Sequence, residues 1–214
     1  MLDKQFFQVK EVVEARKKLE QKKLSIFFKL LFDKVLAILL LFILSPIFVI
    51  LAFLIKLEDG GDVFYRQERV TTNGKLFRIF KFRTMVNNAD KIGSLVTVQN
   101  DSRITKIGSV IRKYRLDEIP QLLNIILGEM SFVGARPEVL KYVEHYTDDM
   151  KVTLLLPAGV TSLSSIEFKD ENEIKNGLGY TVLNKTLQSL KAFMKYYSPD
   201  IEEDVLALFS GVVQ

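Results

Sequence analysis

Two adjacent carboxylates, Asp117 and Glu118, are the side chains whose type and spacing best suit catalysis. They follow a basic cluster that contains Arg112, and they stand where a helix is predicted to begin. A helix N-terminus and nearby cations lower the pKa of a carboxylate and attract phosphate. Neighbouring carboxylates can divide the roles of nucleophile, metal ligand and proton handler between them. The alternative role is structural, with Asp117 capping the helix and Glu118 interacting with the helix dipole.

Further cations could hold a phosphorylated substrate. Lys81 and Arg83 are two residues apart on a predicted strand, so they share one face and could clamp a diphosphate. Arg83 could bind two oxygens at once. A pair of cations is equally suited to protecting an edge strand. The tight turn at 134–137 presents the guanidinium of Arg136, which could bind phosphate. The alternative is that the turn is a plain loop and that Arg136 is simply solvated.

Several sequence blocks occur in an order that resembles one family. The chain is similar to the bacterial sugar transferases, the monotopic polyprenyl-phosphate phosphoglycosyl transferases. The most specific block is Leu-Asp-Glu-Ile-Pro-Gln at 116–121, followed by the Gly-Ala-Arg-Pro turn at 134–137. The resemblance covers residues 29–165 and favours catalysis over capping for Asp117. Its blocks lie at residues 64–70, 73–75, 81–85, 101–108, 111–113, 116–124 and 128–138.

The resemblance implies a site and a location. The family faces the cytoplasm from the bacterial inner membrane, has a re-entrant membrane helix and uses Mg²⁺. Its Asp-Glu pair is catalytic, so Asp117 is expected to form a covalent phosphosugar intermediate. Asp117 and Glu118 are also the expected metal ligands. The family's basic motifs carry to residues expected to bind substrate, which are Lys81, Arg83, Arg112 and Arg136.

The sequence departs from the family pattern in one functional segment. The family's Pro-Gly-Ile-Thr-Gly block leads to an arginine, which residues 157–171 lack, although Lys169 lies near that position. The carboxylate pair and the basic residues are intact, so activity is still expected. The departure leaves the identity of the sugar open.

These residues can perform a complete reaction. A carboxylate attacks the β-phosphorus of a UDP-sugar and expels UMP, and the acyl phosphate passes its phosphosugar to polyprenyl phosphate, such as undecaprenyl phosphate. This would be the first membrane step of capsule, O-antigen, exopolysaccharide or glycoprotein synthesis. The alternative is a non-catalytic membrane-surface protein that binds lipid or serves as a scaffold in a glycan pathway. The sequence leaves the sugar, the pathway and a homo-oligomer open.

Composition narrows the partners of this 214-residue chain. The net charge of +4 favours an acidic partner, such as anionic lipid, nucleic acid or phosphate. No nucleic-acid-binding motif is present, so we expect no nucleic acid partner. The absence of cysteine excludes disulfides and thiolate metal sites, and a single histidine excludes a histidine-rich one.

An apolar segment at 35–55 carries no charge and is long enough to cross or enter a bilayer. It begins too late and runs too long for a cleavable signal peptide. Ser45 and Pro46 predict a structural break in the membrane segment. Both flanks are basic, so a re-entrant hairpin broken there would keep both in the cytoplasm. A kinked single span fits these features equally well.

The remaining patterns predict the elements around the site. Residues 4–34 read as an amphipathic helix lying on an anionic membrane, or packing on its own domain. A β-hairpin is expected at 63–70 and 76–82, around Asn73-Gly74. Helices are expected at 104–114 and 117–127, with an amphipathic stretch at 183–197.

These elements predict an α+β, mainly helical, monotopic membrane protein. Its parts would be an amphipathic N-terminal helix at 1–34, a re-entrant membrane segment at 35–57, and a cytoplasmic catalytic domain with interfacial helices at 58–214.

Overall fold

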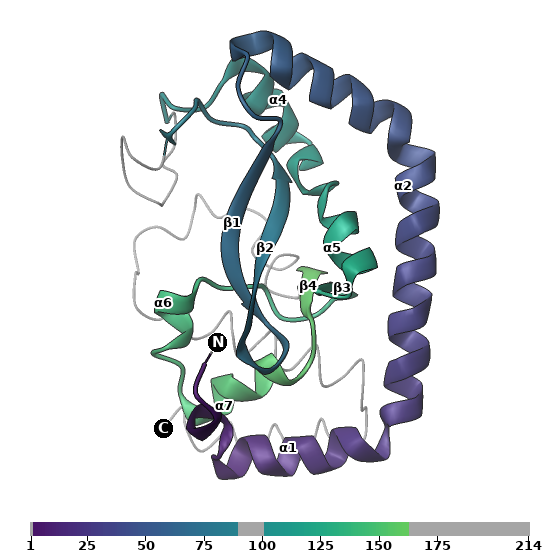
Figure 1. Ribbon diagram of the computed structural model, residues 1–214, viewed down its shortest axis with the longest axis vertical. Coiled ribbons are helices and arrows are strands. Elements are labelled where there is room, and N and C mark those ends of the chain that lie inside the picture. The colour runs from purple at the N-terminus through teal and green to yellow at the C-terminus, as the bar shows by residue number, and fades with distance from the viewer. Residues whose placement is uncertain (1, 90–100, 163–214) are drawn as a thin grey trace. The chain divides into compact units, whose positions relative to one another are not determined.

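The computed structural model describes residues 2–89 and 101–162 (Figure 1). The predicted class is confirmed as a mixture of helix and sheet that is mainly helical. Lys169 and the stretch at 183–197 lie outside the described residues. The α-helices are α1 (Lys10–Gln21), α2 (Lys23–Asp59), α4 (Lys106–Lys113), α5 (Gln121–Leu127), α6 (Leu140–Val143) and α7 (Asp148–Lys151). The strands are β1 (Phe64–Thr71), β2 (Lys75–Phe82), β3 (Met130–Val133) and β4 (Ala158–Thr161). The 3-10 helices are η1 (Lys4–Phe7), η2 (Thr72–Gly74), η3 (Leu116–Glu118) and η4 (Val152–Leu155).

The chain forms two compact units. Unit 1 contains the residues up to Phe28, Arg69–Phe77, and the described residues from Glu129 onward. Unit 2 contains Lys29–Glu68 and Arg78–Gly128. Each unit has its own apolar core, so each can position its side chains by itself.

The single helix predicted at 4–34 is wrong, because the structure divides this segment into η1, α1 and the start of α2. The helical path breaks at Lys22, whose N–H donates to the carbonyl of Leu19. Phe6 and Phe7 pack against the core of unit 1, and Val12 of α1 is fully buried. Packing of these apolar side chains in unit 1 replaces the one continuous amphipathic surface that the sequence suggested.

Helix α2 is continuous through Pro46, but its ribbon bends part-way along (Figure 1). Proline has no N–H, so the carbonyl of Phe42 loses its usual helical partner. The hydroxyl of Ser45 donates to that carbonyl at 2.7 Å instead, which keeps the bent turn satisfied without water. The predicted break is thus a bend in one helix, and the re-entrant course remains a prediction.

Most of the large apolar side chains of α2 are exposed. Among the described residues, α2 is the one helix long and apolar enough to cross a membrane. Only a narrow set of its residues is buried, including Ala37, Leu51 and Ile55. Its buried Asp33 is paired with Lys29 one turn earlier, which compensates a charge placed in an apolar helix. An exposed apolar surface of this length is consistent with membrane association.

The predicted hairpin is confirmed by the neighbouring strands β1 and β2, which η2 connects (Figure 1). Asn73 and Gly74 have φ values of 54° and 72°, in the left-handed region. Asparagine and glycine adopt this region more readily than other residues, so the Asn-Gly signal correctly located the turn. Lys81 is the next-to-last residue of β2.

The core of unit 2 joins the second half of α2 to the hairpin and to α4. Leu51, Ile55, Phe82 and Ile111 form the buried cluster. Helix α4 confirms the prediction at 104–114, and its first turn is capped by Thr105, whose hydroxyl accepts the Gly108 N–H at 2.9 Å. This packing fixes α4 against the end of β2.

Helix α5 is held to β2 by one buried amide. The side chain of Asn124 accepts the Phe80 N–H at 2.8 Å and donates to the Arg78 carbonyl at 3.1 Å. Asn124 is fully buried, so these bonds fix the height of α5 along the strand. Gly128 ends the helix with a φ of 78°, which agrees with the end predicted at residue 127.

Unit 1 is centred on Val70, Val143 and Leu154. Its short strands β3 and β4 pair in parallel, with Met130 opposite Ala158 and Val133 opposite Thr161. The Thr71 hydroxyl donates to the Glu129 carbonyl at 2.7 Å and accepts the Ala158 N–H at 3.3 Å. These bonds fasten the end of β1 to the small parallel sheet.

Candidate active site

Asp117 and Glu118, here called the carboxylate pair, lie in the short helix η3 of unit 2. Arg115 has a φ of 54° and turns the chain sharply after α4. Helix α5 then begins at Gln121, and Pro120 occupies its N-cap position. No side-chain cap bond is made at either helix start, so the structure does not support the capping role for Asp117. The helix predicted at 117–127 therefore starts later than expected.

Lys81 connects the carboxylate pair to strand β2. Its Nζ lies 2.9 Å from Glu118 Oε1 and 3.8 Å from Asp117 Oδ2. All three side chains are partly buried, with exposed fractions of 25% for Lys81, 18% for Asp117 and 24% for Glu118. The structure thus brings together one cation and both predicted catalytic carboxylates, at a site that solvent still reaches.

Burial raises the pKa of Asp117 above its ordinary value, and Glu118 adds to this rise. Lys81 and Arg112 oppose it by attracting the ionised form. The expectation that a helix N-terminus and nearby cations would lower this pKa is therefore wrong, because desolvation is the largest effect. A poorly solvated carboxylate beside cations is a stronger nucleophile than one with all its oxygens hydrogen-bonded.

Arg112 reaches the same region from α4. Its Nε donates to the Thr84 hydroxyl at 2.7 Å, which fixes the direction of the guanidinium. Burial lowers the pKa of Arg112, while attraction to Asp117 raises it. A guanidinium stays charged in proteins, so Arg112 supplies a fixed positive charge near the carboxylate pair.

Arg83 has different partners from Lys81. Strand β2 ends at Phe82, and the next residue, Arg83, is buried, with only 8% of it exposed. Its Nη1 donates to Asp59 and to Asn87, each at 2.7 Å, and its Nη2 also bonds Asp59. The guanidinium is thus engaged within unit 2, and a direct role in binding substrate remains a prediction.

Arg136 belongs to unit 1, where it is exposed on the loop that follows β3. The loop is held at both ends. Gly159 N–H donates to Ala135 O at 2.8 Å, and Arg69 Nη1 donates to Pro137 O at 3.1 Å. Arg136 is thus presented by a rigid turn, and its contact with substrate remains a prediction.

The carboxylate pair has the ligand type that Mg²⁺ prefers but not a complete set of ligands. Mg²⁺ prefers oxygen ligands and is commonly held by one or two carboxylates together with water and substrate phosphates. Two adjacent carboxylates, one of them desolvated, meet that requirement if the donor supplies the phosphates. Within residues 2–89 and 101–162, no group of three or more acidic or histidine side chains could hold the ion without substrate.

Sequence reasoning missed residues that position this site. Thr84 and Asn124 were visible only as parts of family motifs, and their bonds to Arg112 and to β2 come from the structure. Glu58 and Asp59 gave no signal beyond acidic residues at the end of an apolar helix.

The sequence matches the family described as bacterial sugar transferase over residues 24–197. The chain belongs to this family. The match includes the carboxylate pair, Lys81, Arg83, Arg112 and Arg136, so the resemblance predicted from the motifs is confirmed.

Named relatives show which reactions occur in this family. The exopolysaccharide production protein ExoY of Sinorhizobium fredii is 41% identical over 155 residues, which cover 65% of this chain and 69% of that protein. The undecaprenyl-phosphate galactose phosphotransferase of Salmonella typhimurium is 37% identical over 70% of this chain but only 34% of its own length. The UDP-glucose:undecaprenyl-phosphate glucose-1-phosphate transferase of Escherichia coli is 43% identical over 53% of this chain and 25% of its own.

Proposed function

We propose that this protein transfers a phosphosugar from a UDP-sugar to undecaprenyl phosphate and releases UMP. The observation that carries the proposal is the state of Asp117, a desolvated carboxylate that caps no helix and lies beside Lys81. The names of the relatives support the acceptor and the sugar-phosphate chemistry. The product would begin a surface glycan, such as an exopolysaccharide.

In the first half-reaction, an Asp117 carboxylate oxygen attacks the β-phosphorus of the donor. A bond forms between this oxygen and phosphorus, and the bond from phosphorus to the bridging oxygen breaks. The bridging oxygen leaves with UMP, which needs charge neutralisation rather than a strong acid. Lys81 and Arg112 provide positive charge near the reacting carboxylate. Bound Mg²⁺, held by Asp117 and Glu118, would neutralise charge on the donor phosphates.

In the second half-reaction, a phosphate oxygen of undecaprenyl phosphate attacks the same phosphorus. The bond to Asp117 breaks, and the carboxylate is restored. One phosphoanhydride is consumed and another is made, so no ATP is needed. Lys81 Nζ, at 3.8 Å from Asp117 and 2.9 Å from Glu118, would stabilise the negative charge that returns to Asp117.

The donor alone tests this proposal. Purified protein incubated with UDP-sugars, without acceptor, should release one equivalent of UMP and gain the mass of a phosphosugar on the peptide that contains Asp117. Undecaprenyl phosphate should then discharge it. Asp117→Asn keeps the size of the side chain but loses its charge, so it should form no adduct. An adduct on another residue, or substantial turnover by Asp117→Asn, would refute the assignment.

We further infer that α2 enters the inner membrane and returns, with both flanks in the cytoplasm. Support comes from the exposed apolar surface, the basic flanks and the satisfied bend at Ser45-Pro46. The chain has no cysteine, so single cysteines at Lys23 and Asp62 can be labelled cleanly. Neither should react with an impermeant reagent from the periplasm. Periplasmic labelling of one site would instead establish a straight span.

A further inference from the structure

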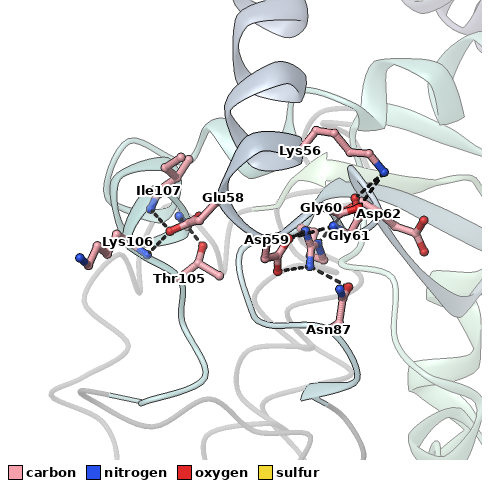
Figure 2. Close-up of polar contacts among 12 residues, drawn as sticks. Lys56, Glu58, Asp59, Gly60, Gly61, Asp62, Asn87, Thr105, Lys106 and Ile107 are labelled. Atoms are coloured by element: carbon pink, nitrogen blue, oxygen red, sulfur yellow. Dashed lines mark hydrogen bonds and ion pairs between the residues drawn. The ribbon is translucent and has the colours of Figure 1, made fainter.

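Helix α2 ends in two adjacent acidic residues, Glu58 and Asp59, here called the helix-end pair. Figure 2 shows their side chains pointing to different sides of the helix end. Glu58 Oε1 accepts the backbone N–H of Lys106 at 2.8 Å and that of Ile107 at 3.2 Å. These amides open α4 and have no partner within the helix. Glu58 therefore caps α4 from a distant part of the chain.

Asp59 holds the segment that follows β2. Its two carboxylate oxygens bind the Nη1 and Nη2 atoms of Arg83, in a bidentate ion pair. Arg83 Nη1 also donates to Asn87, and Arg83 Nε bonds the carbonyl of Asp62. Because Arg83 is buried, this pairing fixes the end of β2 against the end of α2.

The bonds made by Glu58 and Asp59 hold the segments that carry Lys81 and Arg112, the two cations near the carboxylate pair. Lys81 lies two residues before Arg83, on the strand that Asp59 holds. Thr84 follows Arg83 directly, and its hydroxyl accepts from Arg112 at 2.7 Å. Arg112 is also carried by α4, the helix that Glu58 caps. Lys81 and Arg112 thus each depend on an anchor at the end of the apolar helix.

We propose that Glu58 and Asp59 are positioning residues, which place Lys81 and Arg112 at the carboxylate pair. This inference rests on the proposed function of that pair. It also assigns Arg83 to the same anchor, as an arginine that acts through Asp59 and Thr84. Through this arrangement, the end of the apolar helix α2 sets the geometry of the site, and a small displacement there lowers the rate of the chemical step.

The test compares variants that keep or remove each anchor. Asp59→Asn and Glu58→Ala should each lower the rate of adduct formation by about ten- to a hundredfold, with KM for the UDP-sugar changed less than about twofold. Glu58→Gln keeps an oxygen acceptor for the α4 amides, so it should restore most of the rate lost in Glu58→Ala. The double variant Asp59→Ala/Arg83→Ala should be no slower than Arg83→Ala alone.

Asp62→Asn is the matched control for Asp59→Asn. It makes the same chemical change three residues away, and the Asp62 carboxylate is exposed and points away from the network (Figure 2). It should leave the rate unchanged. Wild-type rates in both Asp59→Asn and Glu58→Ala would overturn the inference. So would a raised KM in Arg83→Ala with additive losses in the double variant, because Arg83 would then bind substrate directly.

Hydrogen exchange separates failure of this inference from failure of the proposed function. Glu58→Ala should speed exchange of the Lys106 and Ile107 amides, whereas Glu58→Gln and Asp62→Asn should not. This result does not require activity. If the wild type proves inactive but Glu58→Ala still speeds exchange, the proposed reaction is wrong and the anchoring role of Glu58 is supported. If exchange is unchanged in Glu58→Ala, the anchoring role itself is wrong.

Discussion

The two pairs of adjacent acids in unit 2 show how similar residues acquire different roles. In the helix-end pair, Glu58 bonds backbone amides and Asp59 bonds the buried guanidinium of Arg83. In the carboxylate pair, Asp117 makes no cap bond, and its Oδ2 lies 3.8 Å from Nζ of Lys81. The first pair stabilises the fold through these bonds, whereas the second is the pair that we propose acts on a substrate.

Burial and bonding partners both distinguish the pairs. Glu58 and Asp59 are exposed residues, whereas Asp117 and Glu118 are half-buried. The pKa of Asp59 is lowered mainly by its bond to Arg83, and that of Asp117 is raised mainly by burial. Strong charge-assisted bonds stabilise a carboxylate and reduce its reactivity. A carboxylate whose charge is only weakly offset by bonding partners is therefore informative about function.

The largest expected contrast is between Glu118→Gln and Glu58→Gln. Both variants make the same chemical change to the same residue type. Glu118→Gln should lower turnover by about 10²- to 10⁴-fold, because it removes a charge from the proposed site of Mg²⁺ binding or proton transfer. Glu58→Gln should retain most activity, since a neutral oxygen still accepts the α4 amides. Steady-state UMP release measures turnover of both variants. Equal losses of turnover would contradict the proposal that Glu118 is catalytic and Glu58 structural.

The next contrast concerns the lysine that joins both carboxylates. Lys81→Ala should lower turnover by about a hundredfold, because it removes positive charge next to the proposed nucleophile, Asp117. Lys75→Ala, an exposed lysine at the start of the same strand, is the control and should have no effect. If the two variants behave alike in UMP release, Lys81 would be reduced to a structural ion-pair partner.

Local sequence patterns were sufficient for the parts of the site that lie close together in the chain. Asn73-Gly74 located the turn of the hairpin, and the apolar stripe at 104–114 located α4. The carboxylate pair itself was found because its two members are neighbours in sequence. Such features depend on backbone propensities that act over a few residues.

Long-range partners could not be predicted in the same way. The two-residue period put Arg83 beside Lys81, but burial against the end of α2 gave it Asp59, which is 24 residues away. Desolvation of Asp117 likewise reversed the expected direction of its pKa shift. Neither the partner of a long side chain nor its burial is encoded in periodicity, because both depend on how the elements pack.

Gly108→Ala tests whether close packing of α4 holds Arg112 in place. A Cβ at this position would lie 2.1 Å from the carbonyl oxygen of Thr84, a backbone atom that cannot rotate away. The helix must shift, so we expect a loss of about 1–3 kcal/mol in the free energy of unfolding and a lower turnover. Ser109→Ala, on the exposed side of α4, should change neither. Normal stability of Gly108→Ala would show that α4 tolerates displacement.

The last expected contrast is a difference of sign in stability between the two pairs. Asp59→Asn should destabilise the protein by about 1–3 kcal/mol, because it leaves the buried Arg83 without its counter-charge. The partial exposure of Asp59 keeps this loss below that of a fully buried ion pair. Asp117→Asn should do the opposite at neutral pH. Burial raises the pKa of Asp117 in the folded state above its ordinary value of 3.8, so ionising it there costs stability that a neutral amide does not.

The pH dependence checks this sign. Below the ordinary pKa, Asp117 is protonated in both the folded and unfolded states, and Asp117→Asn should melt at the same temperature as the wild type. As the pH rises through the raised folded-state pKa, the wild type should lose stability relative to the variant. Thermal unfolding in metal-free detergent buffer from acid to neutral pH measures the difference, with Asp62→Asn as the exposed control. A lower melting temperature for Asp117→Asn at neutral pH would mean that Lys81 and Arg112 outweigh desolvation, and Asp117 would then resemble Asp59 as a structural carboxylate.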